Sequence, residues 1–332
     1  MRIIFLALSI IIAAPVSAQD KASEALKLKK PEMAQYQALA SLVDAVMSGK
    51  EQAPADVKVK FNHHFVKSTA NVFVPYVVEI SSGRLASFPI AVYVRAVSKG
   101  APAATEGAAK YAFTDVYFIN DAKRLRSTGA DTAEFSRGME LPAGDFDVYI
   151  AIAEAAPQNR SAAPAKRVVH KQQVSVPSFA AGLTTSSIIL AKTLDEAPQQ
   201  LTTEQQLEQP FTLGGYRITP AFTAAFPKSA ELLFVFFIYN PSNSSTGKPD
   251  VDVNYLFFRA AESKPFSKAA TTALNATTLP AEFNADAGHQ LVVGQGIPLA
   301  SFAAGEYRLE IRITDKTANQ SIARDVPFTV TE

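Results

Sequence analysis

One phrase occurs twice in this chain of 332 residues, and it constrains the fold more than any other feature. The segments LPAGDFDVYIAIAE at 141–154 and FAAGEYRLEIRITD at 302–315 both run from a small residue and a glycine to an acid, an aromatic and alternating apolar residues. Glycine adopts positive φ in a tight turn without steric cost, and a period of two is typical of a half-buried strand. Each copy therefore predicts a turn that leads into a strand with one buried face and one solvated face.

Three further pairs of segments repeat in the same order along the chain. They are VPYVV at 74–78 with VFFIY at 235–239, VYVRA at 92–96 with LFFRA at 256–260, and VSV at 174–176 with FTV at 328–330. The first pair is separated by 161 positions, like the opening phrase, and the second by 164. Loops accept insertions more readily than strands, so unequal spacing is compatible with a common origin. The pattern predicts tandem duplication of one strand-rich unit.

From residue 57 onward, short β-branched and aromatic runs alternate with turn residues, which is typical of a sandwich. We therefore predict an all-β chain with two tandem immunoglobulin-like β-sandwich domains, at 57–194 and 210–332. The polar stretch at 195–209, rich in Gln, Glu and Thr, is predicted to be the linker between them. Pro75 predicts an edge strand or a bulge within the run at 70–80, because proline has no N–H to donate.

The region before the first sandwich, residues 19–56, is predicted to contain a mobile segment and one short helix. Helical spacing of apolar residues over about 32–48, closed by Gly49 as a C-cap, defines that helix. Its apolar stripe favours packing on a neighbouring domain over binding a separate partner.

The first 18 residues match a secretory signal peptide. Arg2 supplies a positive charge, a short apolar run follows, and Val16-Ser17-Ala18 forms a small-x-small cleavage pattern. Cleavage after Ala18 would place the mature protein in the periplasm or outside the cell. The chain contains no cysteine, and an exported chain without disulfides indicates a bacterial protein stabilised by core packing alone.

Two apolar runs stand out, FVPYVVEI and LLFVFFIYN, the second of which contains the apolar stretch 232–239. A long apolar run suits a central strand buried on both faces, since on an edge it would promote aggregation. The alternative is an exposed edge that accepts a strand from a partner. We favour the core interpretation for both runs, less strongly for the run that contains Pro75.

The phrase FAAGEY, followed by alternating apolar residues, resembles the turn and strand that carry the tyrosine corner of immunoglobulin-like and fibronectin type III sandwiches. The resemblance implies that the Tyr307 hydroxyl bonds to backbone upstream, which Phe146 in the first copy lacks the hydroxyl to do. The second half, with PFTLGGYRITP at 210–220, also resembles β-rich C-terminal modules of exported bacterial proteins of acidobacterial type. Those modules occur in von Willebrand factor A-related and GWxTD-motif proteins, but the diagnostic motifs of both families are missing here, and the resemblance implies no activity.

The sequence contains no recognisable catalytic, cofactor-binding or metal-binding constellation. His63 and His64 are adjacent and would point to opposite faces of a strand, while His170 and His289 are isolated. The two carboxylates of Asp250 and Asp252 fall on one face of a predicted strand, and we interpret them as solvated positions rather than a calcium or glycosidase site. The formal net charge of +1 and the lack of a basic cluster argue against nucleic acid as a partner.

These patterns predict a non-enzymatic exported protein that acts as an interaction or scaffold module. Its partner would be another envelope or secreted protein, and no helix of the mature chain is expected to span a membrane. The alternative is a carbohydrate-binding or hydrolytic protein that uses loops of the second sandwich. Asp250, Asp252 and Asp286 would then be the first residues to substitute.

Overall fold

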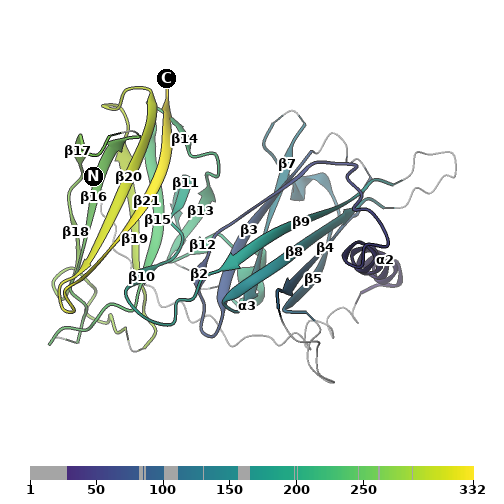
Figure 1. Ribbon diagram of the computed structural model, residues 1–332, viewed down its shortest axis with the longest axis horizontal. Helices are drawn as coiled ribbons and strands as arrows, with labels where there is room; N and C mark the ends of the chain where they lie inside the picture. Colours follow the sequence, from purple (N-terminus) through teal and green to yellow (C-terminus); the bar gives the residue numbers. More distant parts are fainter. Residues whose placement is uncertain are drawn as a thin grey trace. The chain divides into compact units, whose positions relative to one another are not determined.

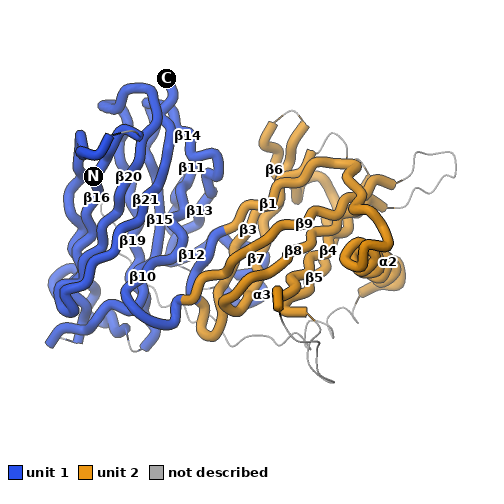
Figure 2. The backbone as a smooth tube through the Cα atoms, in the orientation of Figure 1, with its two compact units in different colours: residues 1–13, 64–67, 179–332 blue, residues 14–63, 68–178 orange. Residues whose placement is uncertain are grey.

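The computed structural model describes residues 28–81, 85, 87–100, 111–129, 131–155, 165–197, 199, 201–245, 247–260, 262–285 and 287–332. The predicted signal peptide at 1–18 lies outside these residues. Strands dominate the described chain, which confirms the all-β class, and they form two compact units (Figure 2). The first sandwich comprises described residues of 28–63 and 68–178, and the second comprises 64–67 and described residues of 179–332.

The first sandwich is built from two antiparallel sheets (Figure 1). One sheet has the order β1 (Val59–His63), β3 (Val72–Ile80), β7 (Ala133–Leu141), β6 (Arg126–Ser127). The other has the order β5 (Phe113–Ile119), β4 (Ile90–Ser98), β8 (Gly144–Ala153), β9 (Arg167–Val176). A 3-10 turn, η2 (Ala122–Arg124), precedes β6, and the helix α2 (Lys30–Met47) belongs to the same unit.

The second sandwich also has two sheets, each with short additional strands. One sheet contains β10 (Thr184–Thr185), β11 (Ile189–Glu196), β12 (Thr212–Leu213), β13 (Tyr216–Pro220), β15 (Glu231–Tyr239) and β19 (Leu291–Pro298). The other contains β14 (Ala225–Pro227), β16 (Val251–Arg259), β17 (Ser267–Lys268), β18 (Thr272–Leu274), β20 (Gly305–Asp315) and β21 (Gln320–Thr331). The unit also includes α3 (Thr203–Glu208) and β2 (Val66–Lys67).

Both sandwiches use one strand order. In the first, β3 lies between β1 and β7, and in the second, β15 lies between β11 and β19. The opposite sheets run β5-β4-β8-β9 and β18-β16-β20-β21 in turn. All four repeated segment pairs fall in corresponding strands. The same immunoglobulin-like strand arrangement therefore occurs in both halves of the chain.

Strand register corrects one of the sequence alignments. Val94 in β4 lies opposite Ile150 in β8, and Tyr255 in β16 lies opposite Ile311 in β20. Ile150 and Ile311 are 161 positions apart, so Val94 corresponds to Tyr255, also 161 positions on. The shift of 164 inferred from VYVRA and LFFRA is therefore wrong, because the shared Arg-Ala pair outweighed the alternation of buried positions.

The tyrosine corner expected at the second copy is present. The Tyr307 hydroxyl donates a hydrogen bond to the Ala303 carbonyl at 2.8 Å, which ties the start of β20 to the turn before it. Gly305 has φ 151° and Gly144 has φ 142°, so both copies use a glycine where other residues are strained. The corresponding Phe146 is buried and has no hydroxyl.

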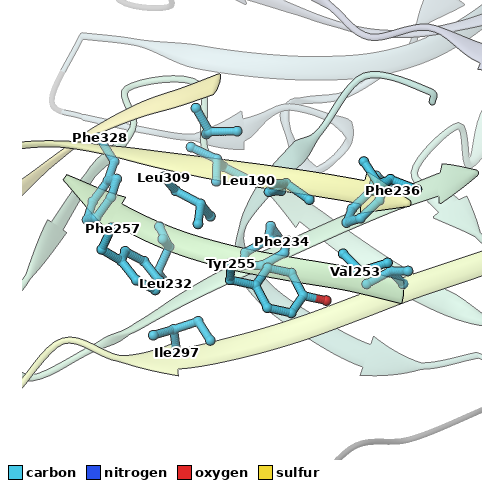
Figure 3. Packing of buried hydrophobic residues seen from close by; sticks show 14 of the residues in the cluster. Leu190, Leu232, Phe234, Phe236, Val253, Tyr255, Phe257, Ile297, Leu309 and Phe328 are labelled. Atoms are coloured by element: carbon cyan, nitrogen blue, oxygen red, sulfur yellow. The ribbon is translucent and has the colours of Figure 1, made fainter. Parts of the chain in front are cut away.

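The apolar run of β15 is buried on both faces. Its inner side chains, Phe234 and Phe236, pack in the core with Tyr255 from the facing sheet (Figure 3). Its outer face is covered by the turn at Leu213-Gly214-Gly215, where Gly214 has φ 59°. A Cβ on Gly214 would lie 3.0 Å from the Phe237 ring. The glycine therefore allows this turn to seat directly on β15, which is a central strand as predicted.

Pro75 does not mark an edge strand. It lies in β3, which is central, opposite Gly138 of β7. The neighbouring strand β1 ends at His63, opposite Tyr76. Pro75 thus lies just past the end of β1. Its missing N–H therefore removes no hydrogen bond between β1 and β3.

The boundary between the units lies at residue 179 rather than in the predicted linker at 195–209. Residues 189–196 form β11, which pairs with β13 and β15 of the second sandwich. The predicted linker also contains α3, which begins at a capping box formed by Thr202 and Gln205. Residues 64–67 add to the second unit, where Phe65 accepts a hydrogen bond from the Ser187 N–H at 2.9 Å.

Candidate functional site

The two carboxylates singled out in the sequence, Asp250 and Asp252, lie together beside a lysine. The Lys316 ammonium is 2.8 Å from Asp250 Oδ1 and 3.2 Å from Asp252 Oδ1. These hydrogen bonds raise the pKa of Lys316, most strongly through Asp250. The Lys316 ammonium therefore bridges the two carboxylates and offsets part of their charge, which explains two acidic residues at one place. Asp286 lies outside the described residues.

The histidines are dispersed as expected. His63 stacks on Phe61 with ring centroids 5.2 Å apart, and burial lowers its pKa. His64 stacks on Phe222 at 5.1 Å. His289 lies edge-on to Phe283, and His170 lies on β9, 3.5 Å from the Gln172 side chain. Within the described part of the chain, no three His, Asp or Glu residues gather as a metal site would require.

The strongest concentration of perturbed titratable groups lies inside the first sandwich. It comprises Tyr76 on β3, Asp115 and Tyr117 on β5, and Arg137 on β7, and we call it the tyrosine–arginine cluster. Arg137 forms an ion pair with Asp115 at 3.0 Å, and its guanidinium lies 4.6 Å from the centroid of the Tyr117 ring. Both members of the ion pair are less than one-fifth exposed. The cluster joins β5, at the edge of one sheet, to β3 and β7 of the other.

Burial dominates the electrostatics of the tyrosine–arginine cluster. It raises the pKa of Tyr76 and Tyr117 well above the usual value for a phenol, and the Asp115 carboxylate adds to both shifts. The two hydroxyls lie next to each other, and neither makes a hydrogen bond of normal geometry. Both phenols are therefore neutral at physiological pH. The Arg137–Asp115 ion pair beside them is itself mostly buried.

Sequence reasoning missed this cluster because it missed β7. The acidic residues of DTAEF at 131–135 make the start of β7 look like a charged loop, although Ala133, Phe135, Met139 and Leu141 are buried at alternate positions. Arg137 occupies the remaining inward position and interrupts the apolar alternation. The signal that was available is the period of two on either side of that arginine.

A second tie fixes α2 to the outer face of β4 and β8. Leu39, Leu42 and Val43 are buried in a cluster with Tyr93 and Tyr149. Arg95, only 3% exposed, donates to Asp44 of the helix at 2.5 Å and to the Tyr93 hydroxyl at 2.8 Å. The Tyr111 ring lies 4.0 Å from its guanidinium carbon. The helix thus covers its own sandwich, as its apolar stripe predicted.

The corresponding face of the second sandwich is charged. At the shift of 161, Tyr149 corresponds to Glu310 and Asp147 to Arg308. Arg308 bonds to Asp325 at 2.6 Å, and Arg312 bonds to Glu310 at 2.7 Å. The Arg308 guanidinium also lies 4.0 Å from the Phe258 ring. The same face therefore differs between the two sandwiches. In the first it is apolar and lies under α2, and in the second it carries a network of ion pairs.

Neither helix among the described residues has the length and apolarity needed to cross a membrane.

Comparison with known proteins identifies no family and only weak similarity to solved structures. No protein-family model matches the chain, and no curated protein matches it significantly. Among solved structures, it is similar to a DUF4785 family protein from Legionella pneumophila, with a TM-score of 0.26, 11% identity and 82% of this chain covered. It is also similar to the adhesin InvE of Yersinia pseudotuberculosis, with a TM-score of 0.21, 9% identity and 84% covered. The chain spans 57% and 61% of those two chains.

Proposed function

We propose that this chain is an exported, non-enzymatic interaction or scaffold protein of a bacterial envelope. The observation that carries the proposal is that the two sandwiches share one strand arrangement but differ in the side chains on their outward faces. The apolar face of the first copy is covered by α2, and the matching face of the second copy carries Arg308, Glu310, Arg312 and Asp325. Function on a common fold resides in such grafted surfaces. The charged face of the second sandwich is the binding surface in this proposal.

Export is part of the proposal, and it rests on the pattern of residues 1–18. Cleavage after Ala18 would give a mature chain that begins at Gln19. N-terminal sequencing of protein recovered from the periplasm or medium tests this. A cytoplasmic protein that retains Met1 would contradict export.

Capture of a partner tests the binding surface. Tagged protein is incubated with envelope extract, and bound proteins are compared between wild type, Arg312→Glu and Lys60→Glu. Arg312 is half exposed within the ion-pair network, and Lys60 is an exposed control on β1 of the first sandwich. The proposal expects one partner that Arg312→Glu weakens and Lys60→Glu retains. A partner equally bound by both variants, or repeated capture of nothing, would contradict it.

The carbohydrate alternative has a separate test. Glycan binding and hydrolysis are measured for wild type and for the triple variant with Ala at positions 250, 252 and 286. Because Lys316 already bridges Asp250 and Asp252, we expect no glycan activity for either protein. Activity abolished by the triple substitution would overturn the non-enzymatic proposal.

A further inference from the structure

One edge of the second sandwich presents unused backbone hydrogen-bonding groups. The Leu299 N–H donates to the Ala230 carbonyl, and these residues lie opposite each other in the register of β19 and β15. In an antiparallel ladder such hydrogen-bonded pairs alternate with pairs whose groups point away. Val292, Gly294 and Gly296 therefore direct their N–H and C=O groups to the outside. Pro298 is also at an outward-directed position of this alternation, so its missing N–H removes no hydrogen bond to β15.

No described strand pairs with this edge. Within the described chain β19 pairs with β15 alone. We call the outward backbone of Val292, Gly294 and Gly296 the β19 edge.

Natural edge strands are protected by charges, by short length or by a covering segment. The sequence of β19, LVVGQGIP, contains no charged residue over eight positions. The equivalent strand β7 is protected in two ways. Its start pairs with β6, supported by the Arg126–Glu134 ion pair, and it also carries Arg137 and Glu140. The β19 edge lacks both devices.

We propose that the β19 edge pairs with the same edge of a second copy of this chain. The two strands run antiparallel about a two-fold axis at Gly294. Val292 of one copy then lies opposite Gly296 of the other, and every outward N–H meets an outward C=O. The two sheets join into one continuous sheet across the axis.

The chemistry of β19 favours a second copy over a foreign strand. A two-fold axis places each side chain near those of its own symmetry mate, so a charged edge would repel itself. With no charge on β19, self-pairing meets no such repulsion. Gly294 and Gly296 place no side chain at the crossing. Within their own sheet, Tyr216 and Glu231 already occupy the space that a Cβ on these glycines would need. This self-association does not depend on the proposed function.

Sedimentation of the full chain across a wide concentration range tests the proposal. Val292→Pro removes one outward N–H and leaves the bonds from β19 to β15 intact, while Val292→Thr keeps that N–H and the side-chain shape. We expect concentration-dependent dimers for wild type and Val292→Thr, and a dissociation constant at least about tenfold higher for Val292→Pro. Circular dichroism melts confirm that the variants fold.

Residue-resolved hydrogen exchange of the wild type gives a second measurement that needs no variant. The N–H groups of Val293 and Gln295 bond within the sheet and should be protected at every concentration. Those of Val292, Gly294 and Gly296 should exchange rapidly when dilute and slowly when concentrated. A chain that stays monomeric at high concentration would overturn the proposal. So would a dimer in which these three N–H groups still exchange rapidly.

Discussion

Replacing Tyr307 with phenylalanine removes one oxygen atom from the second sandwich. That oxygen donates to the Ala303 carbonyl at 2.8 Å and closes the corner between β19 and β20. The ring itself packs against Phe302 and Phe328, with centroids 5.2 and 5.5 Å away, and these contacts remain in Tyr307→Phe. The substitution therefore isolates the hydrogen bond from the packing.

The expected loss is about 1 kcal/mol, the usual net value of a hydrogen bond in a folded protein. A larger penalty is not expected, because Ala303 is exposed and water can reach its carbonyl once the hydroxyl is gone. For a unit of this size the loss lowers Tm by about 2–4 °C. Urea titration followed by circular dichroism measures the free energy of unfolding, with calorimetry as a check on Tm.

The first sandwich supplies the reciprocal experiment. Phe146 corresponds to Tyr307, and Pro142 corresponds to Ala303 at the shift of 161. In Phe146→Tyr the added hydroxyl should reach the Pro142 carbonyl, so stability should stay level or rise by up to about 1 kcal/mol. No measurable change in Tyr307→Phe, or a loss above about 2 kcal/mol in Phe146→Tyr, would refute the equivalence of the two corners.

Three further outcomes follow from the packing. Gly214→Ala should destabilise by about 2–4 kcal/mol in chemical denaturation, because φ is 59° and the new Cβ meets Val292 at 2.9 Å; Gly247→Ala, with φ 73° and open space, should cost only about 1 kcal/mol. Leu42→Ala should cost about 2–3 kcal/mol and expose α2 to limited proteolysis, since Leu42 is buried against β4 and β8; unchanged stability would argue against that packing. Burial raises the pKa of six tyrosines, to about 12 for Tyr93. The free energy of unfolding should therefore stay level up to pH 10 and fall above it, by about 1.4 kcal/mol per pH unit for each tyrosine. Absorbance at the phenolate band should then rise together with loss of circular dichroism, and ionisation of these groups without unfolding would contradict their burial.

Much of the architecture could be predicted from local pattern. The strand after Gly305 alternates so regularly that its buried face, Leu309, Ile311 and Ile313, follows from the sequence alone. The same holds for the helix near 32–48, observed at Lys30–Met47 with Gly49 at φ 70° after it. In both cases a single period fixes which side chains are buried, without knowledge of the neighbouring strands.

Other features depend on contacts that no local pattern contains. A central strand can accept Pro75 because the neighbouring strand β1 ends one position before it, at the pair of His63 and Tyr76. Strand β11 belongs to the second sandwich because it pairs with β13 and β15, although it precedes the polar stretch interpreted as a linker.

The candidate site was less predictable than the fold. The tyrosine–arginine cluster draws residues from three strands, and only the closed sandwich brings Asp115 to within 3.0 Å of Arg137. Lys316 could not be linked to Asp250 from the sequence, because the hairpin that carries it is 66 positions further along the chain. Ion pairs between distant segments leave no periodic signal.

The central claim is that both halves are the same sandwich in the same register, and engineered disulfides test it most directly. The chain has no native cysteine to interfere. Asp145 lies opposite Ser175 in the first copy, and the corresponding Glu306 lies opposite Thr329 in the second. The carbonyls of Asp145 and Glu306 both accept bonds from the strand on the other side, so both pairs are non-hydrogen-bonded and close enough to bridge.

Mass spectrometry after mild oxidation reads the result for cysteines at 145 and 175 and, separately, at 306 and 329. Controls move the second cysteine by one residue, to 174 or 328, where its side chain points to the opposite face. The account predicts a complete disulfide in both matched pairs and none in either control. A bridge that forms in one half only, or in a control instead of its matched pair, would contradict it.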